Sequence, residues 1–183
     1  MAKPESTSDN DSVILVDGSS YVYRAYHALP PLSTSTGQPT GAVRGVTTMV
    51  MRILEDHPDS PVGMIFDAKG STFRHDMYDQ YKANRPPMPD DLRPQIQPIY
   101  DICEALGLKI FVVDNVEADD VIGTLATQAE AEGIKTVVST GDKDLAQLVT
   151  KNISLVNTMS NEVLDEAGVM KKFGVKPNQI IDY

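Results

Sequence analysis

The sequence has little of what disulfide-bonded, membrane-spanning or zinc-binding proteins depend on. It holds one cysteine, no tryptophan and three histidines among 183 residues. One cysteine cannot form an internal disulfide, and His27, His57 and His75 are scattered without the spacing of zinc ligands. No apolar run approaches membrane-spanning length, and the opening MAKPESTSDND has no apolar secretory core. We therefore expect a cytoplasmic protein with no membrane partner, whose residues 1–11 form a flexible polar tail.

Acidic residues outnumber basic ones. The chain has 16 Lys and Arg against 26 Asp and Glu, a net charge of -10, which by itself speaks against a polyanionic partner. That argument fails if the acids are concentrated in a pocket that holds divalent cations. Such a pocket is neutralised locally, and a separate basic patch can still meet phosphate. The charge balance therefore leaves nucleic acid open as a partner.

Short apolar runs rich in β-branched residues alternate with stretches of helical periodicity, a pattern typical of an α/β fold with a largely parallel sheet. At 41% hydrophobic content the chain can bury one core, so we expect one domain over residues 12–183. Cys103 is in step with the apolar positions of its helix and is predicted to pack in that core. The expected strands are Val13–Val16, Val62–Phe66, Lys109–Val113, Thr136–Ser139 and Ile153–Val156.

Helical periodicity and end signals predict three long helices. They are Gly41–Glu55, Asp90–Leu106 and Asp119–Glu132. Asp90 or Asp91 is the expected N-cap of the second helix, since it follows the Pro-rich turn RPPMP. Gly107 and Gly133 stand where helix C-caps belong.

Acidic residues follow four of the expected strands. They are Asp17 in VILVDGSS, Asp67 in MIFDAKG, Glu117, Asp119 and Asp120 in FVVDNVEADD, and Asp142 and Asp144 in VVSTGDKD. Each alone could be turn or helix-start chemistry, where carboxylates are favoured. However, the C-terminal ends of parallel strands share one edge, and ligands bind at that edge. The sequence therefore predicts seven carboxylates along one rim.

Such a rim needs a counterion. Two carboxylates about 4 Å apart repel by roughly 4 kcal/mol at an effective dielectric near 20. Oxygen ligands without His or Cys suit Mg²⁺ or Mn²⁺, and paired ions suit phosphoryl chemistry. We therefore expect a divalent metal site.

The stretch KGSTFRHDMYDQYKANRPPMP, residues 69–89, gathers basic and aromatic side chains in an otherwise acidic chain. They are Lys69, Arg74, Lys82 and Arg85 among Phe73, Tyr78 and Tyr81. A mobile, solvated amphipathic helix would have this composition without any specific role. A segment that meets phosphates would have it too.

Four stretches, in their order and spacing, carry a resemblance to a known family. VDGSSYVYRAYHALPPL, FDAKGSTFRHDMYDQYKANRPPMPDDLRPQI, VEADDVIGTLA and STGDKDLAQLV resemble the 5′ nuclease domain of bacterial DNA polymerase I. That domain is a relative of flap endonucleases within the PIN-like nucleases. The resemblance runs from about Val13 to the last residue. It implies a PIN-like fold, a mostly parallel central sheet flanked by helices, with a helical gateway over residues 69–89.

The resemblance also implies roles for single residues. The same seven acids would hold divalent metals, Mg²⁺ or Mn²⁺ in two sites, and Asp120 would be catalytic as well. Lys82 and Arg85 match the basic pair of the gateway, implied to be catalytic and to grip the substrate. Arg24 matches a phosphate-contacting position, and Tyr81 could stack on an unpaired base.

The implied activity is metal-dependent hydrolysis of DNA, or of an RNA primer, at 5′ ends or flap junctions in replication and repair. The implied partners are DNA with 5′ flaps, nicks or RNA primers, and a downstream polymerase module. The chain is expected to be a monomer near the bacterial nucleoid. It stops at NQIIDY, where the family continues into further metal-ligand aspartates and a helix-three-turn-helix element. We therefore expect weaker and less structure-selective cleavage.

Two other functions remain open. One is a non-catalytic nucleic-acid-binding domain with the same fold. The other is a haloacid-dehalogenase-like phosphatase, in which an Asp after the first strand is followed two residues on by a second Asp. Here that second position is Ser19, so the general-acid role is vacant.

Overall fold

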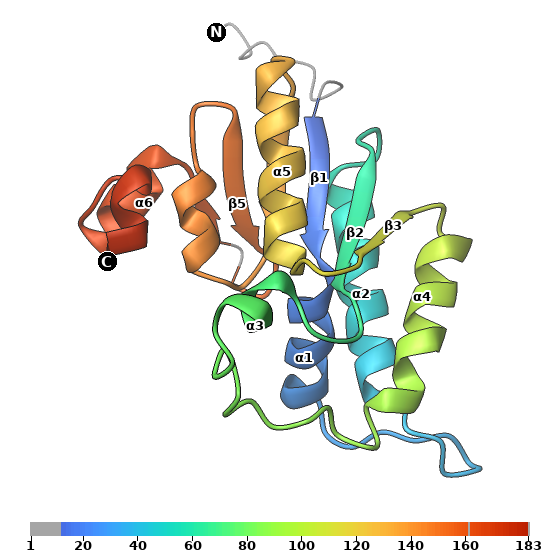
Figure 1. The fold of residues 1–183 in the computed structure, drawn as a ribbon. Coiled ribbons are helices and arrows are strands. Elements are labelled where there is room, and N and C mark those ends of the chain that lie inside the picture. The colour runs from blue at the N-terminus through green and yellow to red at the C-terminus, as the bar shows by residue number, and fades with distance from the viewer. Residues whose placement is uncertain (1–11, 161, 183) are drawn as a thin grey trace, which may run out of the picture.

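The computed structural model describes residues 12–160 and 162–182, and the predicted tail at 1–11 lies outside the described residues. Its core is a six-stranded sheet with the order β3-β2-β1-β4-β5-β6 (Figure 1). The strands are β1 Ser12–Asp17, β2 Val62–Asp67, β3 Lys109–Val113, β4 Lys135–Ser139, β5 Ile153–Asn157 and β6 Glu162–Leu164. The first five pair in parallel, and β6 runs antiparallel to β5. The predicted mostly parallel sheet is confirmed, with all five predicted strands in it.

Both faces of the sheet are covered, which explains why its strands are apolar runs rather than alternating ones. Successive side chains of a strand point to opposite faces. In β1, Ile14 and Val16 therefore pack into one core cluster while Leu15 packs into the other. Cys103 belongs to the first cluster with 1% of its surface exposed, as predicted. Burial raises the pKa of its thiol to about 11.

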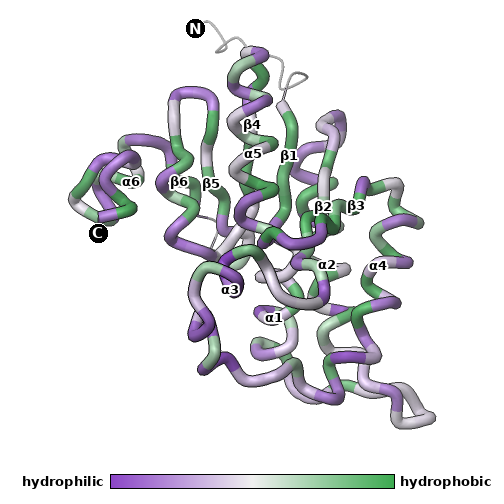
Figure 2. Tube along the Cα trace, viewed as in Figure 1, coloured by the Kyte–Doolittle hydropathy of each residue, from purple (hydrophilic) through white to green (hydrophobic). Residues whose placement is uncertain are grey.

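Helices form a layer on each side of the sheet. One layer holds α1 Gly18–Ala28, α2 Gly41–Asp56 and α4 Ile96–Ala105. The other holds α5 Ala118–Ala131 and α6 Glu166–Phe173, with the 3-10 helices η3 Asp144–Leu148 and η4 Pro177–Asp182. Hydrophobic stretches lie on the strands and on the helices around them, with polar stretches in the loops (Figure 2). The short helix α3 Phe73–Met77 stands apart, beside the first turn of α5 (Figure 1).

Two of the three predicted helices are confirmed, and the start of the third is wrong. Helices α2 and α5 agree with prediction to within one residue at each end. Helix α4 begins at Ile96 after a 3-10 turn, Arg93–Gln95, and neither Asp90 nor Asp91 is its N-cap. Pro94 has no N–H to donate, so the chain tightens there before the α-helix begins. Helices α1 and α6 and strand β6 are not predicted from the sequence.

Glycine ends two helices as predicted. Gly107 follows α4 with φ 79°, and Gly133 follows α5 with φ 76°. Both angles lie in the left-handed region that favours glycine. The chain thus turns sharply into β3 and β4, and the carboxyl ends of those strands come to the edge where β1 and β2 also end.

Strand β1 sits between β2 and β4, so the connections leave it in opposite directions. In open α/β sheets this switch point opens a crevice outside the carboxyl ends of the strands. The ends of β1 and β4 flank it here. In the part of the chain that the structure describes, no helix is both long and apolar enough to cross a membrane.

Candidate active site

Asp17 ends β1 at the switch point and begins α1. Its Oδ1 accepts from the backbone N–H of Ser20 at 2.9 Å, which caps the helix, and its Oδ2 accepts from the Thr140 hydroxyl at 2.8 Å. Only 4% of its surface is exposed. Burial raises the pKa of Asp17, an effect that these hydrogen bonds oppose. This carboxylate is therefore fixed in direction and largely withdrawn from water.

Asp67 and Asp142 come from the strands on either side of β1. Asp67 ends β2, and its Oδ1 accepts from the N–H of Ala118, the first residue of α5, at 2.8 Å. Asp142 follows β4 in the turn before η3. Its Oδ1 accepts from the N–H of Asp144 at 2.9 Å. Asp144 itself is exposed at the start of η3.

Asp119 lies in the first turn of α5 and feels these acids. Burial, together with the charges of Asp17, Asp142 and Asp67, raises the pKa of Asp119 to about 7. The four carboxylates from β1, β2, α5 and the β4 turn are therefore close enough for their charges to interact.

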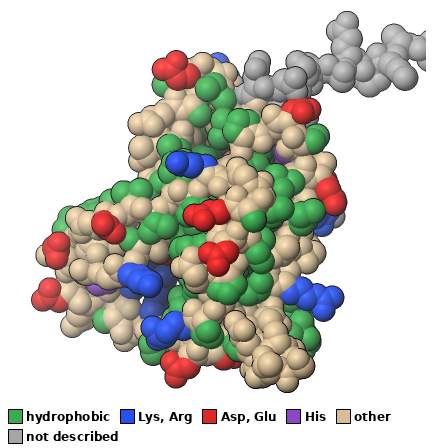
Figure 3. All heavy atoms as spheres, turned by 90° about the vertical axis from the view of Figure 1, so that its right-hand side faces the viewer, with side chains coloured by type: hydrophobic (Ala, Val, Ile, Leu, Met, Phe, Trp, Pro, Cys, Tyr) green, Lys and Arg blue, Asp and Glu red, His purple; other side chains and the backbone are tan. Residues whose placement is uncertain are grey.

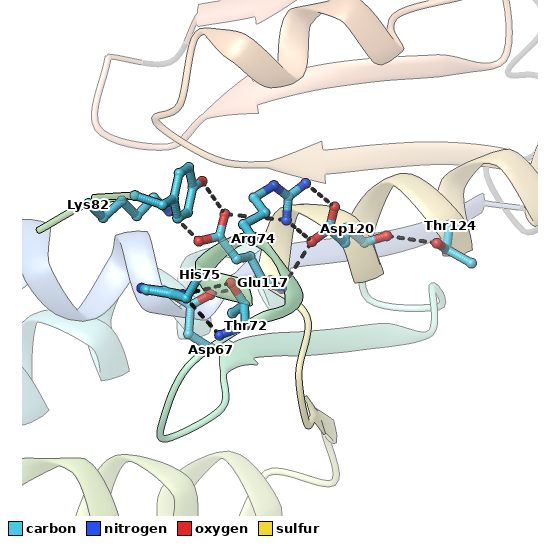
Figure 4. A network of polar contacts seen from close by, with 10 residues as sticks. Asp67, Thr72, Arg74, His75, Lys82, Glu117, Asp120 and Thr124 are labelled. Atoms are coloured by element: carbon cyan, nitrogen blue, oxygen red, sulfur yellow. Dashed lines mark hydrogen bonds and ion pairs between the residues drawn. The ribbon is translucent and has the colours of Figure 1, made fainter. Parts of the chain in front are cut away.

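Glu117 and Asp120 differ from these four because basic side chains occupy them (Figure 4). Arg74 of α3 donates to both oxygens of Asp120, and Lys82 donates to Glu117 at 2.5 Å. The hydrogen bond from Arg74 lowers the pKa of Asp120. Burial acts to raise the pKa of Glu117, but hydrogen bonds from Lys82 and Tyr81 outweigh it and the pKa falls.

The gateway segment, residues 69–89, is attached to the start of α5 by these contacts. Its α-helical part is short, Phe73–Met77, and turns follow it. Lys82 adopts a left-handed backbone, φ 54°, which is uncommon for a residue with a side chain. Tyr81 donates its hydroxyl to Glu117 at 3.0 Å, and its ring meets His75 edge-on. The alternative of a solvated helix without specific contacts does not describe these residues.

A cleft of about 180 Å³ lies between the gateway segment and the strand ends. Five predicted acids line it together with both predicted gateway cations. The acids are Asp17, Asp67, Glu117, Asp119 and Asp142, and the cations are Lys82 and Arg85. Asp120 and Asp144 instead line an adjoining groove of about 790 Å³ between α5 and η3, which Glu117 and Asp119 also border. Seen from the side of β3 and α4, basic side chains border a hollow in the surface (Figure 3).

The donor chemistry of the cleft fits a hard divalent cation, because its acidic ligands offer only oxygen. In residues 12–160 and 162–182, however, no three acidic, His or Cys side chains are arranged to hold an ion as they stand. The hydrogen bonds explain this arrangement. Asp17 and Asp67 face N–H and O–H donors, and Glu117 and Asp120 face cations. Ion binding at the last two would require them to exchange these partners.

Arg24 is not brought to this cleft. Its Nη2 donates to Oδ1 of Asn157 at 2.6 Å, and its guanidinium packs against Gly141. A Cβ at Gly141 would come within 2.7 Å of Arg24 Nη1, so glycine permits this close approach. The predicted phosphate contact at Arg24 would need the side chain to leave Asn157.

The sequence does not predict several residues of the site. Arg74 is predicted only as one of four basic residues in the gateway segment, yet it holds Asp120. Ser19 accepts from the N–H of Asp67 at 2.8 Å, and Tyr23 lines the cleft. Thr140 touches two acids. Ser19 and Thr140 each lie within three positions of a predicted acid at a strand end. That short spacing is the sequence signal that could have identified them as site residues.

Comparison with known proteins shows the family of the chain. The chain belongs to the family described as 5′-3′ exonuclease, N-terminal resolvase-like domain, whose match spans residues 12–174. It is 58% identical to DNA polymerase I of Pseudomonas aeruginosa over 171 residues, 93% of this chain and 19% of that protein. It is 44% identical to a 5′-3′ exonuclease of Buchnera aphidicola over 173 residues, 94% of this chain and 57% of that protein.

Among solved structures, the fold resembles the flap endonuclease of bacteriophage T5, seen in a pseudo-enzyme-product complex with DNA and metal ions. The TM-score is 0.71 at 16% sequence identity, over 93% of this chain and 64% of that one. The PIN-like fold predicted from the sequence is therefore confirmed. The chain spans from about a fifth to three fifths of the length of the curated relatives it matches.

Proposed function

We propose that this chain is a divalent-metal-dependent 5′ nuclease that hydrolyses phosphodiesters of DNA, or of an RNA primer, at 5′ ends or flap junctions. One observation carries the proposal: acids from β1, β2, α5 and the β4 turn face two gateway cations across a single cleft. Acidic residues alone would suggest a cation-binding site, and basic residues alone would suggest a phosphate-binding site. Both together suit a phosphodiester held beside divalent ions. The named activities of the relatives support the same reaction.

We assign the cation ligands to two groups. The strand-end acids Asp17, Asp67 and Asp142, with Asp119 of α5, would hold an ion directly or through water. Glu117 and Asp120 would join when substrate draws Lys82 and Arg74 away, and Asp144 would contribute from the start of η3. Bound Mg²⁺ or Mn²⁺ would acidify the attacking water and neutralise charge on the phosphate. The metal-bound solved relative supports this cofactor class.

The gateway residues would bind the substrate. Arg85 lines the cleft and can grip a phosphate through two N–H groups, while Lys82 supplies a point charge. Tyr81 would offer its ring to an unpaired base once its hydroxyl leaves Glu117. Asp120 would then be free to act in catalysis. The proposal also takes DNA with 5′ flaps, nicks or RNA primers as partners, with a polymerase module as the natural neighbour.

The test is cleavage of a 5′-labelled flap duplex with Mg²⁺ or Mn²⁺. Asp17→Asn and Asp120→Asn should lose cleavage, as should the wild type in EDTA, while Asp59→Asn in the turn before β2 should retain it. Cleavage that survives EDTA, or that Asp17→Asn leaves unchanged, would refute the proposed mechanism. Binding of the duplex without cleavage at high protein concentration would favour a non-catalytic binding domain instead.

Family membership favours the nuclease over the phosphatase. Ser19 also argues against the phosphatase, because its hydroxyl accepts from the N–H of Asp67 and thus braces two strand ends. Trapping a phosphoaspartate at Asp17 would reverse that judgement.

A further inference from the structure

Thr140 is a buried residue at the switch point of the sheet, and the proposed mechanism does not use it. It directly follows β4, and its backbone N–H donates to the carbonyl of Val156 on β5 at 3.1 Å. Only 3% of its surface is exposed. Backbone pairing and burial together hold this side chain in one place.

The hydroxyl of Thr140 joins two acids that come from opposite sides of the switch point. It donates to Oδ2 of Asp17 at 2.8 Å across 123 residues of sequence, and it accepts from the N–H of Asp142 at 2.9 Å. Because a hydroxyl has one proton, the bond to Asp17 uses the only one available. One oxygen atom therefore fixes both the Asp17 carboxylate and the turn that carries Asp142.

The two acids joined by Thr140 are each held by a further hydrogen bond. The second Asp17 oxygen is held by the N–H of Ser20 at the start of α1, so the carboxylate cannot rotate without losing a bond. Asp142 in turn accepts from the N–H of Asp144. Like charges on Asp17 and Asp142 favour their separation, and Thr140 opposes it.

We propose that Thr140 is the positioning residue that sets the placement of Asp17 relative to Asp142, and with it the fit of the site to Mg²⁺. The inference rests on the proposed function, since it assumes that these acids hold the ion. Mg²⁺ is small and demands near-ideal octahedral geometry, whereas Ca²⁺ accepts flexible arrangements at longer distances. Loss of the Thr140 hydroxyl, with its hydrogen bonds to Asp17 and Asp142, therefore weakens Mg²⁺ binding more than Ca²⁺ binding.

Thr136, in β4 just before Thr140, provides a matched control. It has 1% of its surface exposed, and its hydroxyl oxygen is buried without a hydrogen-bond partner in the described part of the chain. Thr136→Val and Thr140→Val make the same chemical change at two buried positions four residues apart. They differ in whether a bonded hydroxyl is lost.

The experiment is calorimetric titration of the full chain with Mg²⁺ and with Ca²⁺, on the wild type and the two valine variants. Thr140→Val should weaken Mg²⁺ binding by roughly tenfold or more, as is usual when a residue that orients a metal ligand is lost. Ca²⁺ binding should weaken less, and Thr136→Val should match the wild type. Equal Mg²⁺ affinity in Thr140→Val and the wild type would overturn the inference.

Thr140→Ser and Thr140→Ala settle the result if the valine variant does not fold, because they differ only in the hydroxyl. Serine should restore Mg²⁺ affinity and alanine should not; equal loss in both would assign the effect to packing and overturn the inference. A wild type that binds Mg²⁺ but leaves flap DNA uncut would refute the proposed function while still allowing this comparison. A wild type that binds no Mg²⁺ would refute both.

Discussion

Arg74 grips Asp120 through two hydrogen bonds, from Nη1 to Oδ2 at 2.5 Å and from Nη2 to Oδ1 at 2.6 Å. The pair ties α3 of the gateway segment to the first turn of α5 (Figure 4). Asp120 also accepts from the N–H of Glu117 at 3.0 Å, so the same carboxylate serves helix and gateway. A cation that binds Asp120 must therefore compete with a guanidinium.

Replacing Arg74 with glutamine should strengthen Mg²⁺ binding several-fold, because the competing cation is removed. The same change should lower the unfolding free energy by about 1 kcal/mol at pH 7, typical of a partly exposed charged pair. Calorimetry and urea unfolding would measure the two effects. Arg93→Gln is the control, since Arg93 approaches Asp90 only at 3.9 Å on the surface. Weaker Mg²⁺ binding in Arg74→Gln would contradict the competition.

The stability effect of Arg74→Gln should depend on pH. The hydrogen bond from Arg74 lowers the pKa of Asp120 below its ordinary 3.8. A lowered folded-state pKa contributes stability above the unfolded value, and that contribution disappears as pH falls through the folded value. The wild type and Arg74→Gln should therefore differ at pH 7 and converge in strong acid, as acid unfolding curves would show. A difference of constant size across this range would contradict the assignment.

Asp119 should give the opposite pH dependence. Burial, aided by Asp17, Asp142 and Asp67, raises the pKa of Asp119 from 3.8 to about 7. The folded state holds this proton more tightly, so stability falls as pH rises between 3.8 and about 7. In EDTA, Asp119→Asn should be more stable than the wild type at pH 8, by on the order of 2 kcal/mol.

Urea unfolding at pH 3 and pH 8 would measure that difference, which should vanish at the lower pH. Asp59→Asn, an exposed change before β2, should leave the pH dependence as it is. Added Mg²⁺ should stabilise the wild type more than Asp119→Asn, because the ion favours the ionised carboxylate. Equal stabilisation of both proteins by Mg²⁺ would remove Asp119 from the ligand set.

Arg85 should contribute to DNA binding mainly through charge. Arg85→Ala should weaken flap-duplex binding and reduce the slope of log affinity against log salt concentration by about 1. Lys171→Ala on the exposed side of α6 is the control. Fluorescence anisotropy over a range of salt concentrations would measure the slopes. An unchanged slope in Arg85→Ala would exclude a phosphate contact there.

Gly18 should resist replacement. A Cβ at this position would lie 2.5 Å from the ring of Phe66, which is 4% exposed and cannot easily move. Gly18→Ala should therefore lower the unfolding free energy by about 1 to 3 kcal/mol through overpacking next to Asp17. Gly123→Ala inside α5 meets Leu148 at an ordinary 3.7 Å and should be neutral or stabilising. Urea unfolding of the two alanine variants decides the matter.

The sequence predicted the sheet well because its strands are apolar on both faces and end in acids. Periodicity located α2 and α5, and the glycines after α4 and α5 marked their ends. The sequence does not predict helix α1, because the helix begins inside the DGSS motif, which indicates a turn or a metal ligand at Asp17. In the structure Asp17 also caps the helix.

The pairing of Glu117 and Asp120 with gateway cations could not be predicted from the sequence. Arg74 reaches Asp120 across 46 residues and Lys82 reaches Glu117 across 35, and no local pattern specifies such pairs. The sequence shows that Arg74 and Lys82 are charged, but their partners depend on how the gateway segment packs against the start of α5. The placement of Arg24 on Asn157, 133 residues away, is hidden for the same reason.

The bond between Thr140 and Asp17 also bears on how the protein is made. Contacts this distant in sequence carry a loop-closure entropy cost that must be met before they form. A nascent chain that has emerged only as far as α5 carries Asp17, Asp67, Glu117, Asp119 and Asp120, but lacks the strand that locks the first of them in place. The cleft is therefore complete only once β4 has docked on β1, because a chain that ends at α5 lacks both Thr140 and Asp142.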